Sequence, residues 1–540
     1  MHHPWKDISL RCYGVVMKIY WLLLLVELAK CQSIFSPRNV SCPFSSDCTC
    51  SSTQCSGPID VWCTDQRQFP IFTANSNCEV ASLLIEGHYD SVPSRGLAAF
   101  TDRVFNLKLI SKPGTILQFD PQAFQGSIGL FLERFELEDE RALTEFPSAL
   151  KAFKKLHTLI LNNTAIARIP HGILSEKILE TLRISNSRIN DIDRDALVNL
   201  PFLFNLELPG NNLTAFPRDA LLPVMPSLRS LDMSNNQMIL LETGSFHGFD
   251  RLKQLNLSGN PLALLENGSL NGLERSLMHL DLSKCMITEF PAASLNTLTS
   301  LKTLDLSENR ITVIPRNAFS GMSNLLKVNL ESNPINVIEQ GAFVHATFDT
   351  FILRASKMQQ LDLETFLGST TLTKIVVTEN PTLKTVFSSK NNLESEYALK
   401  EIHLYNNNIT GLDYSLSDWL SREGSKVIIE QNEFFDCNET AVSWLAAVQK
   451  CFQSSQLVVQ NVKCAPVTVE EELFGNFTTL ESALNRINVD CRQFLTSTTA
   501  RTTVKPTSKR RNSATQLYIS SGAVALAVLR IFGSMTGILP

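Results

Sequence analysis

The sequence has no catalytic signature, no long basic block and almost no cysteine across its middle. It lacks H-E-x-x-H, G-x-S-x-G and a glycine-rich phosphate loop, so we expect neither enzymatic activity nor a cofactor. No long run of lysine and arginine occurs in the 540 residues, and the formal net charge is −5, which argues against nucleic acid as a partner. Between Cys78 and Cys437 the only cysteine is Cys285, so no disulfide is expected in the central body.

The N-terminus has the composition of a secretory signal peptide. Three basic residues precede an apolar run at 19–28, and Ala29 and Cys31 occupy small-residue cleavage positions. The run is short for a membrane span. The sequence therefore predicts that residues 1–31 are removed and that the mature chain is extracellular, with a membrane anchor as the alternative.

A secretory route makes the remaining cysteines interpretable as two disulfide-stapled caps, at 32–79 and 431–491. A zinc site at Cys48 and Cys50 is the weaker alternative, because no paired histidines accompany them. The cysteines expected in disulfides are Cys42, Cys48, Cys50, Cys55, Cys63, Cys78, Cys437, Cys451, Cys464 and Cys491.

Between the caps the frame L-x-x-L-x-L-x-x-N-x-L recurs every 23–27 residues. The copies begin at Leu156, Leu179, Leu203, Leu228, Leu252, Leu277, Leu301, Leu325, Phe348, Leu372 and Leu399, with looser copies near Val80, Val104 and Leu132. The L-x-L alternation predicts a short strand with its leucines inward. One coil cannot close such a core alone, so about 14 coils must stack over 80–430. The fold class predicted is an α/β repeat solenoid with a concave parallel β-sheet.

The asparagine of each copy is expected inside the solenoid, where its amide must bond the backbone of its own and neighbouring coils. This predicts a ladder of Asn236, Asn260, Asn309, Asn333, Asn380 and Asn407. Cys285 holds the same slot, and we interpret it as a buried ladder residue rather than a reactive thiol. Thr164, Ser187 and Ser356 fill the slot with hydroxyls.

Together these features resemble the extracellular, typical-length class of leucine-rich-repeat proteins. The segment "CPFSSDCTC" with Cys63 is similar to the N-terminal cap of that family, and Cys55 with Cys78 would add a further bridge. The C-terminal cap departs from the family pattern, because its C-x-C pair is reduced to Cys437. The resemblance implies a horseshoe that binds proteins. Anchored relatives such as chaoptin and connectin are adhesion molecules, and another relative is the non-catalytic subunit of a secreted crustacean luciferase.

The outward strand positions are the default binding surface of such a solenoid. Its centre is polar and acidic, whereas apolar side chains follow toward the C-terminal end, where exposed apolar and aromatic groups often mark contacts. The aspartates have a second interpretation, as habitual members of the L-D-L-S repeat. The candidate partner-binding residues are Arg183, Glu207, Asp232, Asp281, Asp305, Asn329, Ile352, Val376, His403 and Tyr405.

N-glycosylation is expected at some of the N-x-S/T sequons. The sequon between Leu255 and Leu257 faces outward on the concave sheet, so a glycan there would push a protein partner aside. The sequons are at Asn39, Asn162, Asn212, Asn256, Asn267, Asn408, Asn438 and Asn476.

The C-terminal tail predicts an anchor. Residues 492–512 are rich in serine and threonine and suit an extended stalk, and residues 513–540 are largely apolar. Small residues, a spacer and a hydrophobic end are typical of a GPI signal, with attachment at Asn512 or Ser513. Arg530 interrupts the apolar segment, so a membrane-spanning helix and a secreted chain stay open as alternatives.

The sequence thus favours an extracellular protein, tethered at the cell surface by a C-terminal anchor, that binds another protein through its solenoid. Adhesion or ligand capture follows from this arrangement, and homophilic binding is left open. The alternative is a secreted, non-catalytic scaffold subunit of an oligomeric enzyme, or a matrix protein.

Overall fold

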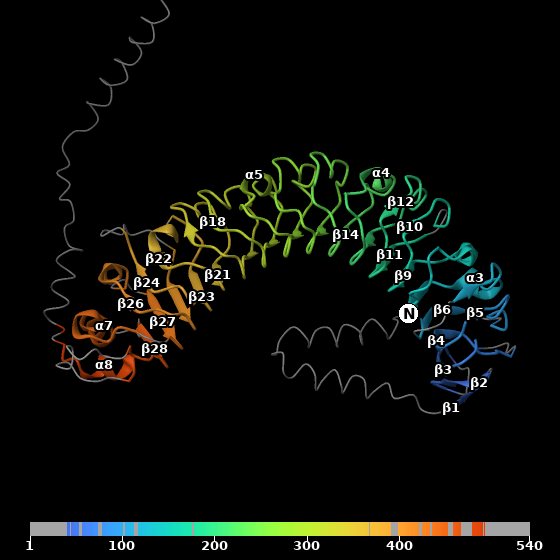
Figure 1. Ribbon diagram of the computed structural model, residues 1–540, viewed down its shortest axis with the longest axis horizontal. Helices are drawn as coiled ribbons and strands as arrows, with labels where there is room; N and C mark the ends of the chain where they lie inside the picture. Colours follow the sequence, from blue (N-terminus) through green and yellow to red (C-terminus); the bar gives the residue numbers. More distant parts are fainter. Residues whose placement is uncertain are drawn as a thin grey trace, which may run out of the picture.

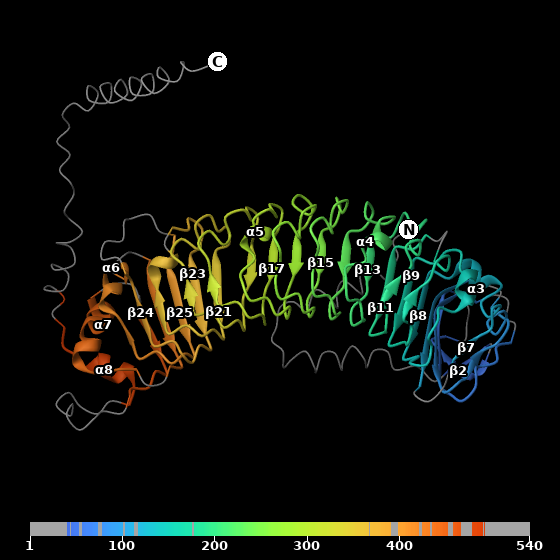
Figure 2. The same cartoon turned by 45° about the horizontal axis from the view of Figure 1, so that its top comes forward.

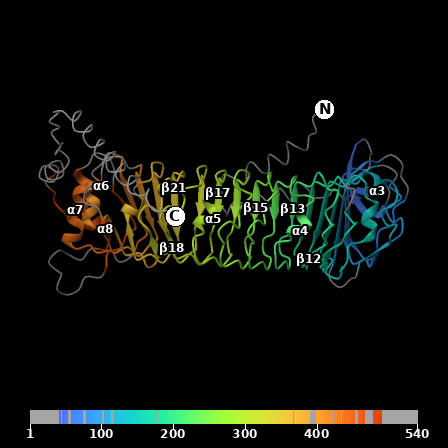
Figure 3. The same ribbon diagram turned by 90° about the horizontal axis from the view of Figure 1, so that it is seen from above.

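The chain is a curved solenoid with a cap at each end (Figure 1). The computed structural model describes residues 40–491, apart from 44, 53–56, 74–77, 101–102, 113–116, 175–177, 367, 390–397, 421–423, 433–434, 452–456, 466–477 and 490. The strands line the inner side of the arc, and irregular coils and short helices cover the outer side (Figures 1 and 2). Seen from above, the coils stack in one file (Figure 3). The predicted leucine-rich-repeat solenoid is confirmed.

Two sheets form the concave face, and their strands are parallel except at the N-terminal cap, where β1, β2 and β3 pair antiparallel. The first sheet has 14 strands: β1 (Val40–Cys42), β2 (Ser45–Cys50), β3 (Ile59–Gln66), β4 (Val80–Gly87), β6 (Val104–Ser111), β8 (Arg134–Glu138), β9 (Thr158–Asn162), β11 (Thr181–Ser185), β13 (Asn205–Glu207), β14 (Ser230–Asp232), β15 (Gln254–Asn256), β16 (His279–Asp281), β17 (Thr303–Asp305) and β19 (Lys327–Asn329). The second has five: β21 (Thr350–Arg354), β23 (Lys374–Thr378), β25 (Glu401–Tyr405), β27 (Lys426–Glu430) and β28 (Leu457–Gln460).

The outer side carries three short strand pairs, one three-stranded sheet and short turns of helix. The paired strands are β5 (Ser91–Val92), β7 (Gln118–Phe119), β10 (Arg168–Ile169), β12 (Asp191–Ile192), β18 (Val313–Ile314) and β20 (Val337–Ile338), and the three-stranded sheet consists of β22 (Gln360–Asp362), β24 (Thr385–Phe387) and β26 (Gly411–Leu412). The helices are α3 (Ser127–Phe131), η1 (Ser148–Ala152), α4 (Arg218–Leu221), α5 (Ala292–Leu295), η2 (Leu363–Phe366), η3 (Tyr414–Leu416) and α6 (Ser417–Leu420), with α7 (Glu439–Cys451) and α8 (Leu480–Arg486) in the C-terminal cap.

A ladder of buried asparagines ties the coils together, as predicted. Asn309 shows the pattern: its Nδ2 donates to the Leu282 and Leu306 carbonyls at 2.8 and 2.9 Å, and its Oδ1 accepts the Ile287 N–H at 3.0 Å. Because each amide joins its own coil to the preceding one, the buried polar groups are satisfied. The structure adds Asn211 and Asn432 to the six predicted members.

Cys285 and Glu140 occupy the ladder slot without an amide group. Cys285 is buried, as predicted, and its thiol donates to the Leu257 carbonyl at 3.3 Å. Burial raises the pKa of this thiol to about 12, so it is not a reactive thiolate. Glu140 also occupies the slot, fully buried, and its carboxylate oxygens have no hydrogen-bond partner among the described residues.

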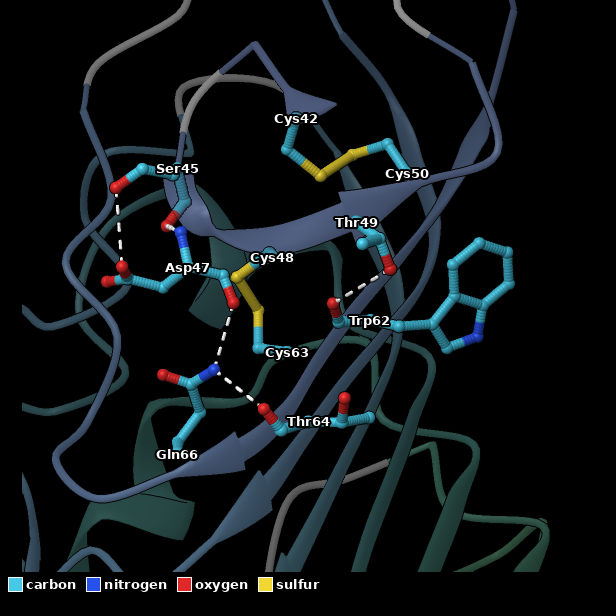
Figure 4. The surroundings of a disulfide bond; sticks show 11 residues. Cys42, Ser45, Asp47, Cys48, Thr49, Cys50, Trp62, Cys63, Thr64 and Gln66 are labelled. Atoms are coloured by element: carbon cyan, nitrogen blue, oxygen red, sulfur yellow. Dashed lines mark hydrogen bonds between the residues drawn. A yellow bond between two sulfur atoms is a disulfide. The ribbon is translucent and has the colours of Figure 1, made fainter. Parts of the chain in front are cut away.

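The caps are stapled by disulfides, as the cysteine clusters predict. The N-terminal cap holds Cys42–Cys50 and Cys48–Cys63 (Figure 4), and the C-terminal cap holds Cys437–Cys464 and Cys451–Cys491. Cys78 is also disulfide-bonded. Several predicted features lie outside the described residues: the signal peptide, Cys55, Asn39, Asn476, the stalk, Asn512 and Ser513.

Candidate binding surfaces

The structure aligns the predicted outward positions in one row along each concave sheet. Register pairing links neighbouring strands residue by residue, so positions 24 or so apart in sequence become lateral neighbours. The row on the long sheet is Ile160, Arg183, Glu207, Asp232, Asn256, Asp281, Asp305 and Asn329. The row on the short sheet is Ile352, Val376, His403, Ile428 and Val458.

The centre of the long sheet is acidic. We call Glu207, Asp232, Asp281 and Asp305 the acidic band. On the five strands β13–β17 the alternating outward positions carry no lysine or arginine. A shallow hollow of about 620 Å³ lies over these strands and reaches β19, where Lys327 lines its end. Arg183, on the adjacent strand, is paired with Glu207 at 2.9 Å. The band therefore presents net negative charge to a partner.

The aspartates of the band also have a local structural role. Asp232 and Asp281 each accept, through Oδ1, the N–H of the serine two residues on, at 2.8 and 2.9 Å. Asp305 does the same at 2.9 Å, and its Oδ2 accepts from Asn329 Nδ2 at 3.0 Å. One carboxylate oxygen of each aspartate therefore has the structural role that the repeat-based interpretation expects. The negative charge of the carboxylate still lies on the concave face.

The row on the short sheet is apolar around one histidine. Ile352 is 47% exposed, and Val376 and Val458 are half-buried. Ile428 continues the row in buried form. Sequence reasoning missed Ile428 and Val458, because the leucine frame is lost after the copy that begins at Leu399. The β-branched runs "KVIIE" and "LVVQ" were the available signal.

His403 corrects an expectation. It was expected to be exposed at an outward position, yet only 7% of it is accessible, because Glu401 and Tyr405 on the same face of β25 cover it. Its Nε2 lies 2.8 Å from Glu401 Oε2, and its Nδ1 contacts the Tyr405 hydroxyl. The hydrogen bond between His403 and Glu401 is the main cause of the lowered Glu401 pKa. Burial raises the pKa of Tyr405, and the negative charge of Glu430 adds to that rise. His403 therefore positions its neighbours rather than meeting a partner directly.

Asn256 lies in the middle of the acidic band, as predicted. Its Oδ1 accepts the N–H and the hydroxyl of Ser258, at 3.0 and 2.7 Å. These bonds use the oxygen and not the nitrogen that would carry a glycan. Glycosylation at this position remains a prediction.

A family model described as leucine rich repeat matches residues 154–213, 206–262, 275–335 and 299–347. Podocan of Mus musculus is 37% identical over 100 residues, which is 18% of this chain and 16% of podocan. Lumican of Coturnix japonica is 33% identical over 119 residues, 22% of this chain and 33% of lumican. The matches thus span at most a third of either relative.

Solved solenoids show the same fold. The Toll–Spatzle complex of Drosophila aligns at a TM-score of 0.53 and 13% identity, covering 83% of this chain and 76% of that one. The TLR13–ssRNA13 complex aligns at 0.50 and 19% identity, covering 77% and 60%. Within the described residues no helix is long and apolar enough to cross a membrane. The same part of the chain contains no cluster of three or more residues suited to hold a metal ion.

Proposed function

We propose that this leucine-rich-repeat protein binds another extracellular protein on its concave face, without catalysis. The observation that carries the proposal is the apolar row beside the acidic band. Burial of apolar surface is the dominant favourable term in most protein–protein association, whereas charged groups orient the partner and speed its approach. Ile352, half exposed at the boundary between the two surfaces, is the anchor that we expect a partner to cover.

We further propose that the protein acts at the cell surface, in adhesion or as a ligand-capturing co-receptor, held by a GPI anchor at Asn512 or Ser513. The predicted signal peptide, the disulfide-bonded caps and the apolar C-terminal segment support this placement. The Toll solenoid was solved in complex with Spatzle, so a partner protein is compatible with this fold. We also propose that the protein is similar in role to the adhesion proteins chaoptin and connectin. Its partner on another cell would then include a second copy of this chain.

The proposal is tested on cells that express the full chain. Phosphatidylinositol-specific phospholipase C should release the protein into the medium, whereas protein that is free before treatment would count against the anchor. Surface cross-linking and quantitative mass spectrometry should then identify a partner that is captured in fixed ratio. A catalytic polypeptide in that position would favour the scaffold-subunit alternative.

A matched pair of variants decides whether the concave face is responsible. Ile352→Asp places a charge in the apolar row, and Ile239→Asp places the same charge at an isoleucine outside the concave strands, 68% exposed. Capture should fall about tenfold or more for Ile352→Asp alone. Equal capture by both variants would overturn the concave-face proposal.

A further inference from the structure

One edge of the long sheet is basic, although the sequence contains no basic run there. Arg229, Lys253 and Lys302 each follow the first leucine of their repeat. Backbone bonds place them in one row: Lys253 N–H donates to the Arg229 carbonyl at 2.8 Å, Met278 N–H to Lys253 at 2.9 Å, and Lys302 N–H to Met278 at 2.8 Å. The solenoid thus gathers cations that are 24 or more residues apart.

Two arginines extend this row at the turns that enter the strands. Arg251 precedes Leu252 directly, and Arg275 lies two residues before Leu277. We call Arg229, Arg251, Lys253, Arg275 and Lys302 the basic rim. All five side chains are exposed, and none forms a salt bridge with an acidic residue of the described chain.

The acidic residues on the same turns do not neutralise the rim. Asp250 is exposed beside Arg251, and Glu274 uses Oε2 to accept the Gly272 N–H at 3.0 Å. The acidic band lies beyond the rim on the strands themselves: its member Asp232, for example, is three residues after Arg229, on β14. Five cations against two carboxylates leave a positive edge alongside a negative face, and this positive field is open to an external anion.

We propose that the basic rim binds a sulfated polysaccharide chain, laid along the solenoid axis. Successive coils are spaced about 4.8 Å apart, so the rim presents its cations over roughly 15 Å. Because the side chains are exposed, each contact is weak, and only a polymer with many anionic groups gains from all of them. This site lies outside the concave rows and goes beyond the protein-binding function proposed above.

A sulfated glycan suits the site better than a nucleic acid. The predicted secretory route places the rim where such glycans occur. Single-stranded nucleic acids are held largely by bases stacked on aromatic rings. Two aromatic rings lie one coil before Arg229: Phe204 already carries the Arg229 guanidinium, 4.5 Å from its centroid, and Phe202 is half exposed. One open ring does not provide the series of rings on which successive bases stack.

The test measures binding of the full chain to heparin-derived oligosaccharides of increasing length. Affinity should rise with length and fall with salt, and chemically desulfated chains of equal length should bind far more weakly. The variant Lys253→Gln/Lys302→Gln should bind about tenfold more weakly, and the slope of log affinity against log salt should decrease by about two. An unchanged thermal midpoint would show that this variant is folded.

The control variant is Lys357→Gln/Lys384→Gln, which removes two exposed lysines that lie off the rim and, like the rim lysines, form no salt bridge within the described residues. It should retain wild-type affinity for the glycan. The proposal is overturned if wild-type protein does not bind, if both double variants lose affinity equally, or if desulfated chains bind as well. Tighter binding of a single-stranded oligonucleotide of matched charge would assign the rim to nucleic acid instead. Because Ile352→Asp leaves the rim intact, glycan binding and protein capture fail independently.

Discussion

The long and short concave sheets share one interior and present opposite exteriors. In both, inward leucines or their β-branched equivalents alternate with outward residues, as in β17 and β23. The outward row is charged and polar on the long sheet, and apolar around His403 on the short one. The interior is constrained by stacking, whereas the outward positions are free to vary. Differences in binding between the two sheets must therefore come from the outward rows.

The junction between the sheets shows what the asparagine ladder contributes. Ile311 N–H donates to the Asn333 amide of the next coil at 3.1 Å, but Ile335 N–H turns back to the Asn333 carbonyl of its own coil, because the next slot holds Ser356. Leu262 N–H does the same where the next slot holds Cys285. At that point the strands still pair, so a missing amide weakens a junction without breaking the sheet by itself.

The core continues across the junction even though the sheet does not. Phe343 packs against Phe319, Phe351 and Phe366 with ring centroids 4.8–5.6 Å apart. On the outer side, a hollow of about 750 Å³ lined by Val337, Met358 and other residues marks the same place. Aromatic packing thus helps to hold the coils together where β19 and β21 do not pair as strands.

The largest expected effect comes from breaking the ladder within the long sheet. Asn309→Ala removes the partner of the Ile287 N–H and of the Leu282 and Leu306 carbonyls, and should lower the free energy of unfolding by about 3 kcal/mol. Ser356→Ala removes a single hydroxyl that contacts Asn380 and should cost about 1 kcal/mol. Urea denaturation midpoints compare the two. Equal losses of unfolding free energy in the two variants would show that a ladder asparagine contributes no more to stability than the serine at the junction.

The next effect separates what the two outward rows do for a partner. Asp232→Ser/Asp281→Ser removes charge and keeps a side-chain oxygen that can accept the backbone N–H two residues on. Asparagine is avoided at both positions because it would create the sequons Asn-Met-Ser and Asn-Leu-Ser on the concave face. The association rate of the captured partner should fall about tenfold, with less salt dependence, whereas Ile352→Asp should mainly raise the dissociation rate. Surface plasmon resonance at two salt concentrations measures both. An unchanged association rate would remove the acidic band from the interface.

Much of this molecule follows from the sequence because each coil obeys local constraints. The spacing of Leu304, Leu306 and Asn309 predicts strand, turn and buried amide together, and repetition predicts the stack. The cysteine clusters predict the stapled caps for the same reason. These features need no knowledge of which coil lies beside which.

Features that depend on lateral neighbours were not predicted. Arg229 and Lys253 are far apart in sequence and become adjacent only once the register is fixed, so the basic rim was missed. A cation recurring directly after the first leucine of a repeat was the available signal. The burial of His403 was missed for a related reason: an outward position fixes direction, but side chains on the same strand decide accessibility.

A smaller effect should come from repairing the junction. Ser356→Asn supplies an amide in the slot opposite the Ile335 N–H, as Asn333 does for Ile311. We expect stabilisation of about 1 kcal/mol and a sharper unfolding transition, because the two sheets would then unfold more nearly as one unit. Cys285→Asn is the matched repair inside an intact sheet and should stabilise without sharpening the transition. If both variants sharpened the unfolding transition equally, the junction would not be what limits the cooperativity of unfolding.

The smallest effect is a pH dependence confined to the short sheet. The hydrogen bond from His403 holds the pKa of Glu401 below its usual 4.5, with Lys374 and Lys426 adding to the shift and burial opposing it. Because the folded-state pKa is the lower one, the stabilisation is present above about pH 4.5 and is lost as the pH falls through the folded value.

The Glu401 side chain is 41% exposed, so solvent screening limits this contribution to about 0.5 kcal/mol or less. Glu401→Gln should therefore be slightly less stable than wild type at pH 6, and the two denaturation midpoints should converge toward pH 3. Glu430→Gln removes a carboxylate from the neighbouring strand without taking a hydrogen bond from the imidazole, and its difference from wild type should not show this convergence. Parallel curves for wild type and Glu401→Gln would mean that the imidazole contact contributes nothing, which would leave the short sheet defined by its apolar row alone.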